Sequence, residues 1–224
     1  PGMGYPLVPG YETVGVVVDK RASSKLKVGD HVFVPGANCY EKEKGLFGAS
    51  ASLLLASDEK LIKIDSELKA KGTLFALAAT ARHALAGLGN KLPSLIVGHG
   101  VLGRLLARLT IAAGGEPPTV WESNPLRVGH QTDYKVIDPL KDSSSDHEAI
   151  YEASGDISVL DKIIPKLKKN GEIVLAGFYS SPISFAFPPA FMREARFRIS
   201  AEFNTVDINI TRSLLETGAL SLEG

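Results

Sequence analysis

Hydrophobic and polar residues alternate over short stretches in the first seventy positions of the chain. This period of two is typical of half-buried β-strands, and it predicts strands at residues 12–19, 31–34, 52–56 and 60–64. Glycine and proline turns, such as Val28-Gly29-Asp30 and Val34-Pro35-Gly36, separate them. The first part of the chain is therefore predicted to be a compact β-rich unit.

From about residue 72 the pattern changes to helices and strands in alternation. Leu102, Leu105 and Leu109 share one face of a predicted helix that ends at Gly114-Gly115. Further helical patterns cover 72–88, 160–167 and 213–217, and strands are predicted at 95–97, 119–122, 136–137, 149–153, 172–176 and 197–201. Such alternation predicts an α/β fold, a Rossmann doubly wound parallel sheet.

A glycine loop follows the first strand of this second part. Gly98, His99, Gly100, Val101, Leu102 and Gly103 fit the pattern G-x-G-x-x-G, directly after the strand and directly before a helix. Gly98 permits the tight turn, Gly100 allows a pyrophosphate to approach the backbone, and Gly103 allows close packing of helix and strand. The helix N-terminus adds free N–H groups and a partial positive charge. The loop therefore predicts dinucleotide binding.

An acidic residue, Glu122, stands 19 positions after Gly103, at the end of the next predicted strand. We expect it to accept hydrogen bonds from the adenosine ribose hydroxyls, which favours NAD over NADP because a 2′-phosphate would meet a carboxylate there. Arg127 is either a contact to the adenine or pyrophosphate or a solvated residue. The His99 ring either faces the ligand or is merely tolerated in the loop.

Composition and charge narrow the class of partner. Lys and Arg number 25 and Asp and Glu number 25, so no net field attracts nucleic acid or an anionic membrane. No apolar run reaches the roughly 18 to 20 residues that span a bilayer, and the single cysteine, Cys39, indicates a reducing compartment. We expect a soluble, cytoplasmic protein. The chain starts at Pro1 and stops just after a helical pattern, so we expect further residues at both ends.

Several motifs resemble those of the medium-chain dehydrogenase/reductase superfamily. Residues 7–15, LVPGYETVG, resemble its P-x-x-x-G-H-E-x-x-G signature, and residues 28–32, VGDHV, resemble its V-G-D-x-V turn. Residues 79–81, ATA, resemble the helix before its nucleotide domain, and residues 170–177 resemble the last strands of that domain. This resemblance implies a partial GroES-like catalytic domain at 1–71, a Rossmann NAD-binding domain at 72–205, and the start of a return segment at 206–224.

Within the superfamily, several longer stretches of the sequence resemble those of the bacteriochlorophyllide a dehydrogenases. The strings include YPLVPGYE at 5–12, GDHVFVPGANCY at 29–40 and LIVGHGVLGRLLARLT at 95–110. The resemblance implies an enzyme of bacteriochlorophyll a biosynthesis that uses NAD to oxidise the 3-(1-hydroxyethyl) side chain of a bacteriochlorophyllide to 3-acetyl. Its partner would be this tetrapyrrole substrate, which would keep the enzyme near pigment-bearing membranes.

The zinc enzymes of the superfamily bind their metal through the histidine of G-H-E, and here Tyr11 occupies that place. A single cysteine also cannot build a four-cysteine zinc lobe, so we expect no metal site. The hydroxyl proton must then leave through a side chain or water. Tyr11 is either the group that touches the substrate oxygen or a packed residue of the β unit. Glu12 is either a proton relay or a brace of the fold.

Four further residues are candidates for cofactor contact through the resemblance. Thr80 occupies the helix position that approaches the nicotinamide, Ser154 follows a strand on the ribose side, and Gly177-Phe178 end the strand that passes alongside the nicotinamide. An apolar cluster near that end is a pigment wall, a subunit contact or part of the core; its members are Phe185, Phe187, Phe191 and Met192.

Three functions remain open from the sequence. The first is the zinc-free dehydrogenase, expected as a homodimer paired through an edge strand within 196–202. The second is a quinone- or enone-reducing relative, which usually prefers NADPH and is disfavoured by Glu122. The third is a non-catalytic dinucleotide-binding module.

Overall fold

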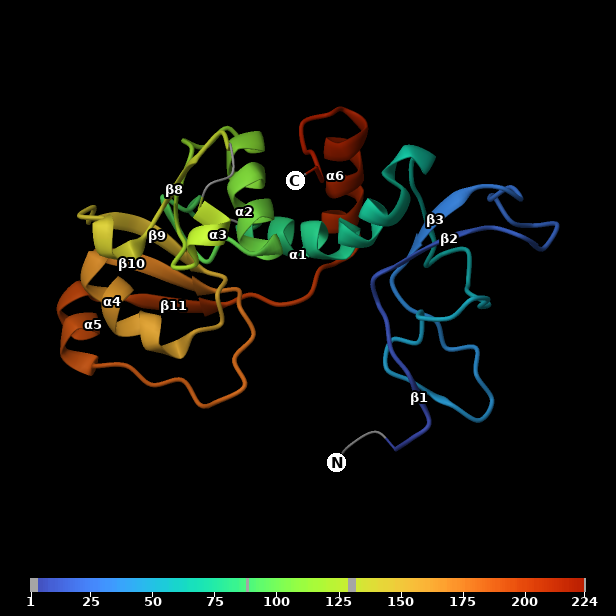
Figure 1. Ribbon diagram of the computed structural model, residues 1–224, viewed down its shortest axis with the longest axis horizontal. Coiled ribbons are helices and arrows are strands. Elements are labelled where there is room, and N and C mark those ends of the chain that lie inside the picture. Colours follow the sequence, from blue (N-terminus) through green and yellow to red (C-terminus); the bar gives the residue numbers. More distant parts are fainter. Residues whose placement is uncertain (1–3, 88, 129–131, 224) are drawn as a thin grey trace. The chain divides into compact units, whose positions relative to one another are not determined.

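The computed structural model of the protein describes residues 4–87, 89–128 and 132–223 (Figure 1). The chain divides into two compact units, one of residues 1–76 with 222–224 and the other of residues 77–221. No helix among the described residues is long and apolar enough to cross a bilayer.

The first unit is built from short strands, as the alternating pattern predicts. β2 (Thr13–Val16), β3 (His31–Val34) and β5 (Ile62–Lys63) form an antiparallel sheet in the order β2-β3-β5. β1 (Leu7–Val8) pairs with β4 (Lys44–Gly45) in a separate parallel ladder. The core of the unit gathers around the buried residues of β3, where the ring of Phe33 lies 5.3 Å from that of Phe75.

The predicted strand at 52–56 is wrong. These residues form bends and irregular backbone rather than a ladder. Leu53 and Leu55 are 72% and 73% exposed, so the leucines that suggested a strand face outward and gain nothing from pairing. Two short elements of this unit, β1 and β4, have no periodic signal because each is two residues long.

The second unit is a six-stranded parallel sheet in the order β11-β10-β9-β6-β7-β8. Its strands are β6 (Leu95–Val97), β7 (Thr119–Trp121), β8 (Lys135–Ile137), β9 (His147–Glu152), β10 (Leu167–Leu175) and β11 (Arg196–Ile199). The chain winds outward from β6 in one direction, then returns to β9 and winds in the other. This order confirms the doubly wound prediction, and it places the topological switch point between β6 and β9.

Helices precede, connect and follow these strands (Figure 1). They are α1 (Phe75–Leu85), preceded by the 3₁₀ segment η1 (Ser66–Leu74), then α2 (Val101–Ala112), α3 (Pro125–Val128), α4 (Leu160–Ile163), α5 (Phe187–Arg193) and α6 (Thr205–Glu216). Short 3₁₀ turns η2 (Pro139–Lys141), η3 (Ile157–Val159) and η4 (Ile164–Lys166) complete the connections. The core packs α4 and η4 against the buried side chains of β6, β9 and β10.

The predicted helix at 160–167 is shorter than its apolar pattern suggests. α4 ends at Ile163 and Leu167 already begins β10. Pro165 sits inside the pattern and lacks the N–H that another α-helical turn requires. The pairing of β10 with β9 shifts its register between Leu167 and Glu172, where Asn170 has a φ of 63°.

Candidate nucleotide and catalytic sites

The glycine loop lies at the carboxyl end of β6 and opens α2. Gly98 has a φ of 98°, and a Cβ added to it would lie 3.0 Å from the Ser154 nitrogen. A Cβ on Gly103 would lie 1.8 Å from the Gly98 carbonyl oxygen, whereas a Cβ on Gly100 would meet nothing within 4 Å. The three glycines therefore have different roles. Gly98 forms the turn, Gly100 leaves space beside the backbone, and Gly103 allows the helix to pack tightly against the loop.

The N-terminus of α2 is left uncapped by any side chain. Gly100 is the N-cap residue and makes no side-chain hydrogen bond, and no acidic residue occupies the first turn. Val101 is 46% exposed and Leu102 is half-buried. Helix N-termini with free N–H groups bind phosphate, so open space at Gly100 and an uncapped helix together fit a pyrophosphate.

Glu122 directly follows β7 and is buried, at 7% exposure. Its Oε1 accepts a hydrogen bond from the Asn124 backbone N–H at 2.7 Å, and its Oε2 accepts one from the His99 N–H at 3.2 Å. A carboxylate oxygen can accept more than one hydrogen bond. The residue predicted to hold a ribose therefore also fastens the glycine loop.

The His99 ring is buried among protein groups. Its Nδ1 lies 2.8 Å from the carbonyl oxygen of Arg127, and its Nε2 lies 3.0 Å from the hydroxyl of Tyr134. Because a carbonyl oxygen only accepts, Nδ1 donates to it, and the Tyr134 hydroxyl can pair with Nε2 as donor or acceptor. Of the two interpretations of the ring, the geometry favours the one in which it does not face the ligand.

Arg127 extends into solvent from α3. Its side chain is 55% exposed, and its Nη1 lies 4.0 Å from Glu122 Oε2. The exposed guanidinium is thus at the limit of ion-pair distance from the buried carboxylate, and we expect this long contact to contribute little energy. Both earlier interpretations of Arg127, a contact to the cofactor or a solvated residue, fit this geometry.

Ser154, Gly177 and Phe178 lie together at the ends of β9 and β10. The Ser154 N–H donates to Glu152 Oε1 at 2.7 Å, and its hydroxyl donates to the same oxygen. A Cβ on Gly177 would lie 2.6 Å from the Gly155 nitrogen, and the Phe178 ring is 90% exposed. These residues are brought beside the glycine loop because Gly98 itself approaches Ser154.

Sequence reasoning missed Glu152, whose carboxylate organises this group. It is the last residue of β9 and fully buried. Within the string HEAIYEASG the signal was an acid that breaks an otherwise apolar strand end. A buried acid without partners is costly, so this interruption indicates a residue with a dedicated task.

Tyr11 and Glu12 belong to the first unit, where Tyr11 packs its ring 4.9 Å from that of Phe47. Tyr11 is 37% exposed and Glu12 is half-buried. Burial, followed by the neighbouring Glu12 carboxylate, raises the pKa of Tyr11 above its ordinary 10.0. The phenol is therefore protonated at neutral pH and can donate a hydrogen bond.

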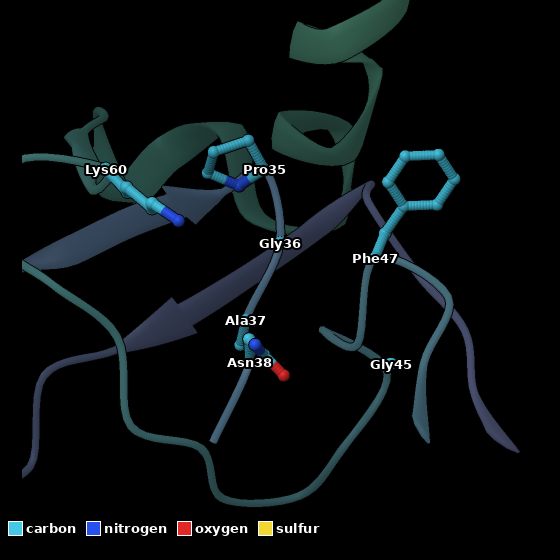
Figure 2. A pocket seen from close by; sticks show the side chains of 7 residues that line it. All are labelled: Pro35, Gly36, Ala37, Asn38, Gly45, Phe47 and Lys60. Atoms are coloured by element: carbon cyan, nitrogen blue, oxygen red, sulfur yellow. The ribbon is translucent and has the colours of Figure 1, made fainter. Parts of the chain in front are cut away.

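An open pocket of about 460 Å³ lies in the same unit (Figure 2). Its lining residues are Pro35, Gly36, Ala37, Asn38, Gly45, Phe47 and Lys60. Phe47 also contacts Tyr11, so the candidate catalytic tyrosine stands beside this pocket.

Thr80 lies in the middle of α1, in the second unit, and is half-buried. Arg82 and His83 follow on the same helix and both bind the carboxylate of Asp207 in α6, at 2.5 Å and 2.7 Å. The pairing holds the Thr80 helix against α6.

Comparisons with known proteins agree with this geometry. Residues 1–66 match the alcohol dehydrogenase GroES-like domain. The chain is 56% identical over 227 residues to 2-desacetyl-2-hydroxyethyl bacteriochlorophyllide A dehydrogenase of Cereibacter sphaeroides, covering 99% of this chain and 71% of that protein.

Solved structures share the fold at low identity. A protein from Sinorhizobium meliloti 1021 described as a zinc-binding dehydrogenase, bound to NADP, matches 96% of this chain and 74% of its own with a TM-score of 0.79 at 18% identity. Acetophenone reductase from Geotrichum candidum, in complex with NAD, matches 97% of this chain and 74% of its own with a TM-score of 0.74 at 20% identity.

A GroES-like domain joined to a doubly wound sheet with a glycine loop after its first strand defines a medium-chain dehydrogenase/reductase. Within that superfamily, the chain belongs to the 2-desacetyl-2-hydroxyethyl bacteriochlorophyllide A dehydrogenase family. It is a member of a family of dehydrogenases that act on a hydroxyl group.

Proposed function

We propose that the protein is an NAD-dependent, zinc-independent dehydrogenase of bacteriochlorophyll a biosynthesis. Its substrate is the 3-(1-hydroxyethyl) group of a bacteriochlorophyllide, which it oxidises to 3-acetyl. The observation that carries the proposal is 56% identity along nearly the whole chain to a dehydrogenase named for this substrate. The open, uncapped glycine loop supports it independently, since it suits a dinucleotide.

The proposed cofactor would lie across the switch point of the sheet. Gly98 to Gly103 would hold its pyrophosphate, Glu122 its adenosine ribose, and Ser154, Gly177 and Phe178 its nicotinamide side. When bound, NAD accepts the hydride that leaves the alcohol carbon. The protein's own part is to orient the alcohol, exclude water and take up the hydroxyl proton.

Glu122 favours NAD because its buried carboxylate would repel a 2′-phosphate. We expect the wild-type protein to bind NAD at least about tenfold more tightly than NADP, a difference of about 1.4 kcal/mol. Glu122→Ala should narrow that ratio and also loosen the loop, since the His99 N–H loses its acceptor. Calorimetric titration of both variants with both nucleotides measures the ratio; equal wild-type affinities would contradict the preference.

The residue at position 11 of the first unit supports catalysis without zinc. Tyr11 stands where zinc relatives in the superfamily have a histidine ligand, and tyrosine is not one of the Cys, His, Asp and Glu side chains that bind zinc in proteins. Among the described residues, no group of three histidine, cysteine, aspartate or glutamate side chains could hold a metal ion.

For catalysis we propose that the Tyr11 hydroxyl donates a hydrogen bond to the substrate oxygen. The Glu12 carboxylate would take up the proton that the substrate hydroxyl loses and pass it on to solvent. Thr80 would contact the nicotinamide from α1. Tyr11→Phe removes one hydroxyl and keeps the ring packed on Phe47, so turnover should fall by about 10²-fold or more with NAD affinity unchanged. Steady-state kinetics of the full-length protein decides this, because unchanged turnover leaves Tyr11 with a packing role.

We further propose that residues 1–71 belong to the catalytic domain, 72–205 to the NAD-binding domain, and the chain after 205 to the return toward the catalytic domain. A homodimer paired through β11 would join two nucleotide-binding sheets. Two alternatives have weaker support: a quinone or enone reductase would not need Glu122, and a non-catalytic dinucleotide module would not need the Tyr11-Glu12 pair.

A further inference from the structure

Glu152 is a fully buried carboxylate at the centre of the sheet's carboxyl edge. In the ladders it lies opposite Val97, the last residue before the glycine loop, and opposite Leu175, the last residue of β10. Glu152 therefore lies where the loops that follow β6, β9 and β10 all begin. Burying a charge there is costly unless it is fully hydrogen-bonded.

Four donors converge on this carboxylate. Oε1 accepts from the N–H of Ser154 at 2.7 Å and from the Ser154 hydroxyl. Oε2 accepts from the N–H of Gly155 at 3.2 Å and from the hydroxyl of Tyr179. Three of these donors belong to the loop after β9 and one to the loop after β10, so the carboxylate joins the two loops.

Close backbone approach reinforces the same joint. A Cβ on Gly155 would lie 2.6 Å from the Phe178 carbonyl oxygen, and a Cβ on Gly177 would lie 2.6 Å from the Gly155 nitrogen. The N–H groups of Ala176 and Gly177 both donate to the Glu152 carbonyl oxygen, at 2.8 Å and 2.9 Å. The two loops therefore meet backbone to backbone, and the Glu152 side chain sets how closely they do so.

The sheet order says which part of a dinucleotide these loops face. Glu122, the ribose candidate, follows β7 on one side of β6, whereas β9 and β10 lie on the other side. A dinucleotide whose pyrophosphate rests on the β6 loop must extend its second nucleotide over β9 and β10. This step rests on the proposed function.

We propose that Glu152 is a positioning residue for the nicotinamide half of the cofactor, acting through Ser154, Gly155 and Tyr179. The Ser154 N–H and hydroxyl both donate to Glu152, so neither is available to donate to the cofactor. The Ser154 carbonyl oxygen is the group that remains for a cofactor contact. The Tyr179 hydroxyl, from the loop after β10, donates to the same carboxylate. Burial, and then the hydrogen bond to Glu152, raises the pKa of Tyr179, so its hydroxyl remains a donor throughout the neutral range.

Half-cofactor binding tests this role in the full-length protein. Calorimetry compares NAD with AMP, which carries only the adenosine half, for wild type, Glu152→Gln, Glu152→Ala and Tyr179→Phe. We expect Glu152→Ala to raise the Kd for NAD by at least about tenfold while the Kd for AMP stays within about twofold. Glu152→Gln should fall between, because its amide N–H₂ would oppose the Gly155 N–H. Tyr179→Phe should shift NAD affinity in the same direction by less.

Glu148→Gln is the matched control. Glu148 lies on the same strand and also accepts hydrogen bonds, from Lys91 at 2.8 Å and Lys168 at 2.9 Å, but at the surface. It should leave both affinities unchanged. Equal weakening of NAD and AMP, or no weakening in any variant, overturns the positioning role. If Glu152→Ala does not fold, Glu152→Gln and Tyr179→Phe decide. A wild type that binds neither nucleotide overturns the proposed function, and the role of Glu152 with it.

Discussion

Gly100 and Gly103 stand three positions apart in one loop, yet a methyl group added to each would meet different surroundings. At Gly103 it would lie 1.8 Å from a carbonyl oxygen, and at Gly100 it would enter open space. Gly103→Ala should therefore destabilise the fold by about 1–3 kcal/mol. Gly100→Ala should keep the fold and weaken NAD binding, because the methyl group occupies the space proposed for the pyrophosphate.

Urea unfolding and NAD titration of the two variants separate these effects. Each variant serves as the control for the other, since the substitution and the loop are the same. Gly100→Ala with wild-type NAD affinity would contradict the placement of the pyrophosphate.

The residues that sequence reasoning found are those with a local signal. Glu122 was found because it follows a glycine loop at a diagnostic distance and directly ends a strand. Glu152 was missed because its importance depends on Tyr179, 27 positions away, and on the approach of two loops. The inward turn of the His99 ring depends likewise on Tyr134 and the Arg127 carbonyl, which no spacing rule connects.

At the level of elements, a buried ion cluster joins α1 to α6. Asp207 is fully buried and binds Arg82 and His83 on α1. It also closes a capping box with Asn204 at the start of α6. Burial opposes ionisation of Asp207, but hydrogen bonds from Arg82, the Asn204 backbone and His83 outweigh it and hold its pKa below 3.8.

Asp207→Asn should therefore lower the free energy of unfolding at neutral pH by about 3–5 kcal/mol, because it leaves a partly buried guanidinium without its counter-charge. A depressed native pKa stabilises the fold above the ordinary pKa, and that contribution is lost as the pH falls below about 3.8. The difference between wild type and variant should thus shrink in acid. Urea unfolding at pH 7 and near pH 3.5 measures it.

Glu216→Gln on the same helix is the control. Glu216 forms an exposed pair with Arg212 at 3.8 Å, and its replacement should change stability by less than about 0.5 kcal/mol. A pH-independent difference for Asp207→Asn would contradict the ionic account.

Elements with long periodic patterns were predicted well, and their ends less so. α2 and the strands β6, β7 and β9 agree with the apolar periodicity. The pattern at 213–217 predicted only the end of α6, which starts at Thr205 with its own cap. Its start was missed because Val206, Ile208 and Ile210 alternate with polar residues, a spacing typical of a strand and not of a helix. The prediction of a strand at 52–56 was wrong because its leucines give the hydrophobic signal of a strand although Leu53 and Leu55 are exposed.

For the whole molecule, β11 is an edge of the sheet, as expected for residues 196–202. Phe197 and Ile199 are 36% and 76% exposed, and an unpaired edge strand offers hydrogen-bonding groups to a second copy. In the proposed homodimer, Ile199→Lys should raise the dimer dissociation constant by at least about tenfold. Sedimentation measures this, with Leu140→Lys, exposed in η2, as the control. An unchanged dimer would place the contact elsewhere.

The reaction proposed for this protein is the oxidation of a hydroxyethyl pigment with NAD as hydride acceptor. The most direct measurement follows pigment absorbance and NADH together while the full-length protein acts on a 3-(1-hydroxyethyl) bacteriochlorophyllide, with NAD or NADP and with or without a zinc chelator. We predict equimolar formation of the 3-acetyl pigment and NADH, faster with NAD than with NADP and insensitive to the chelator. No pigment conversion, or conversion only with NADP or only without chelator, would contradict the account.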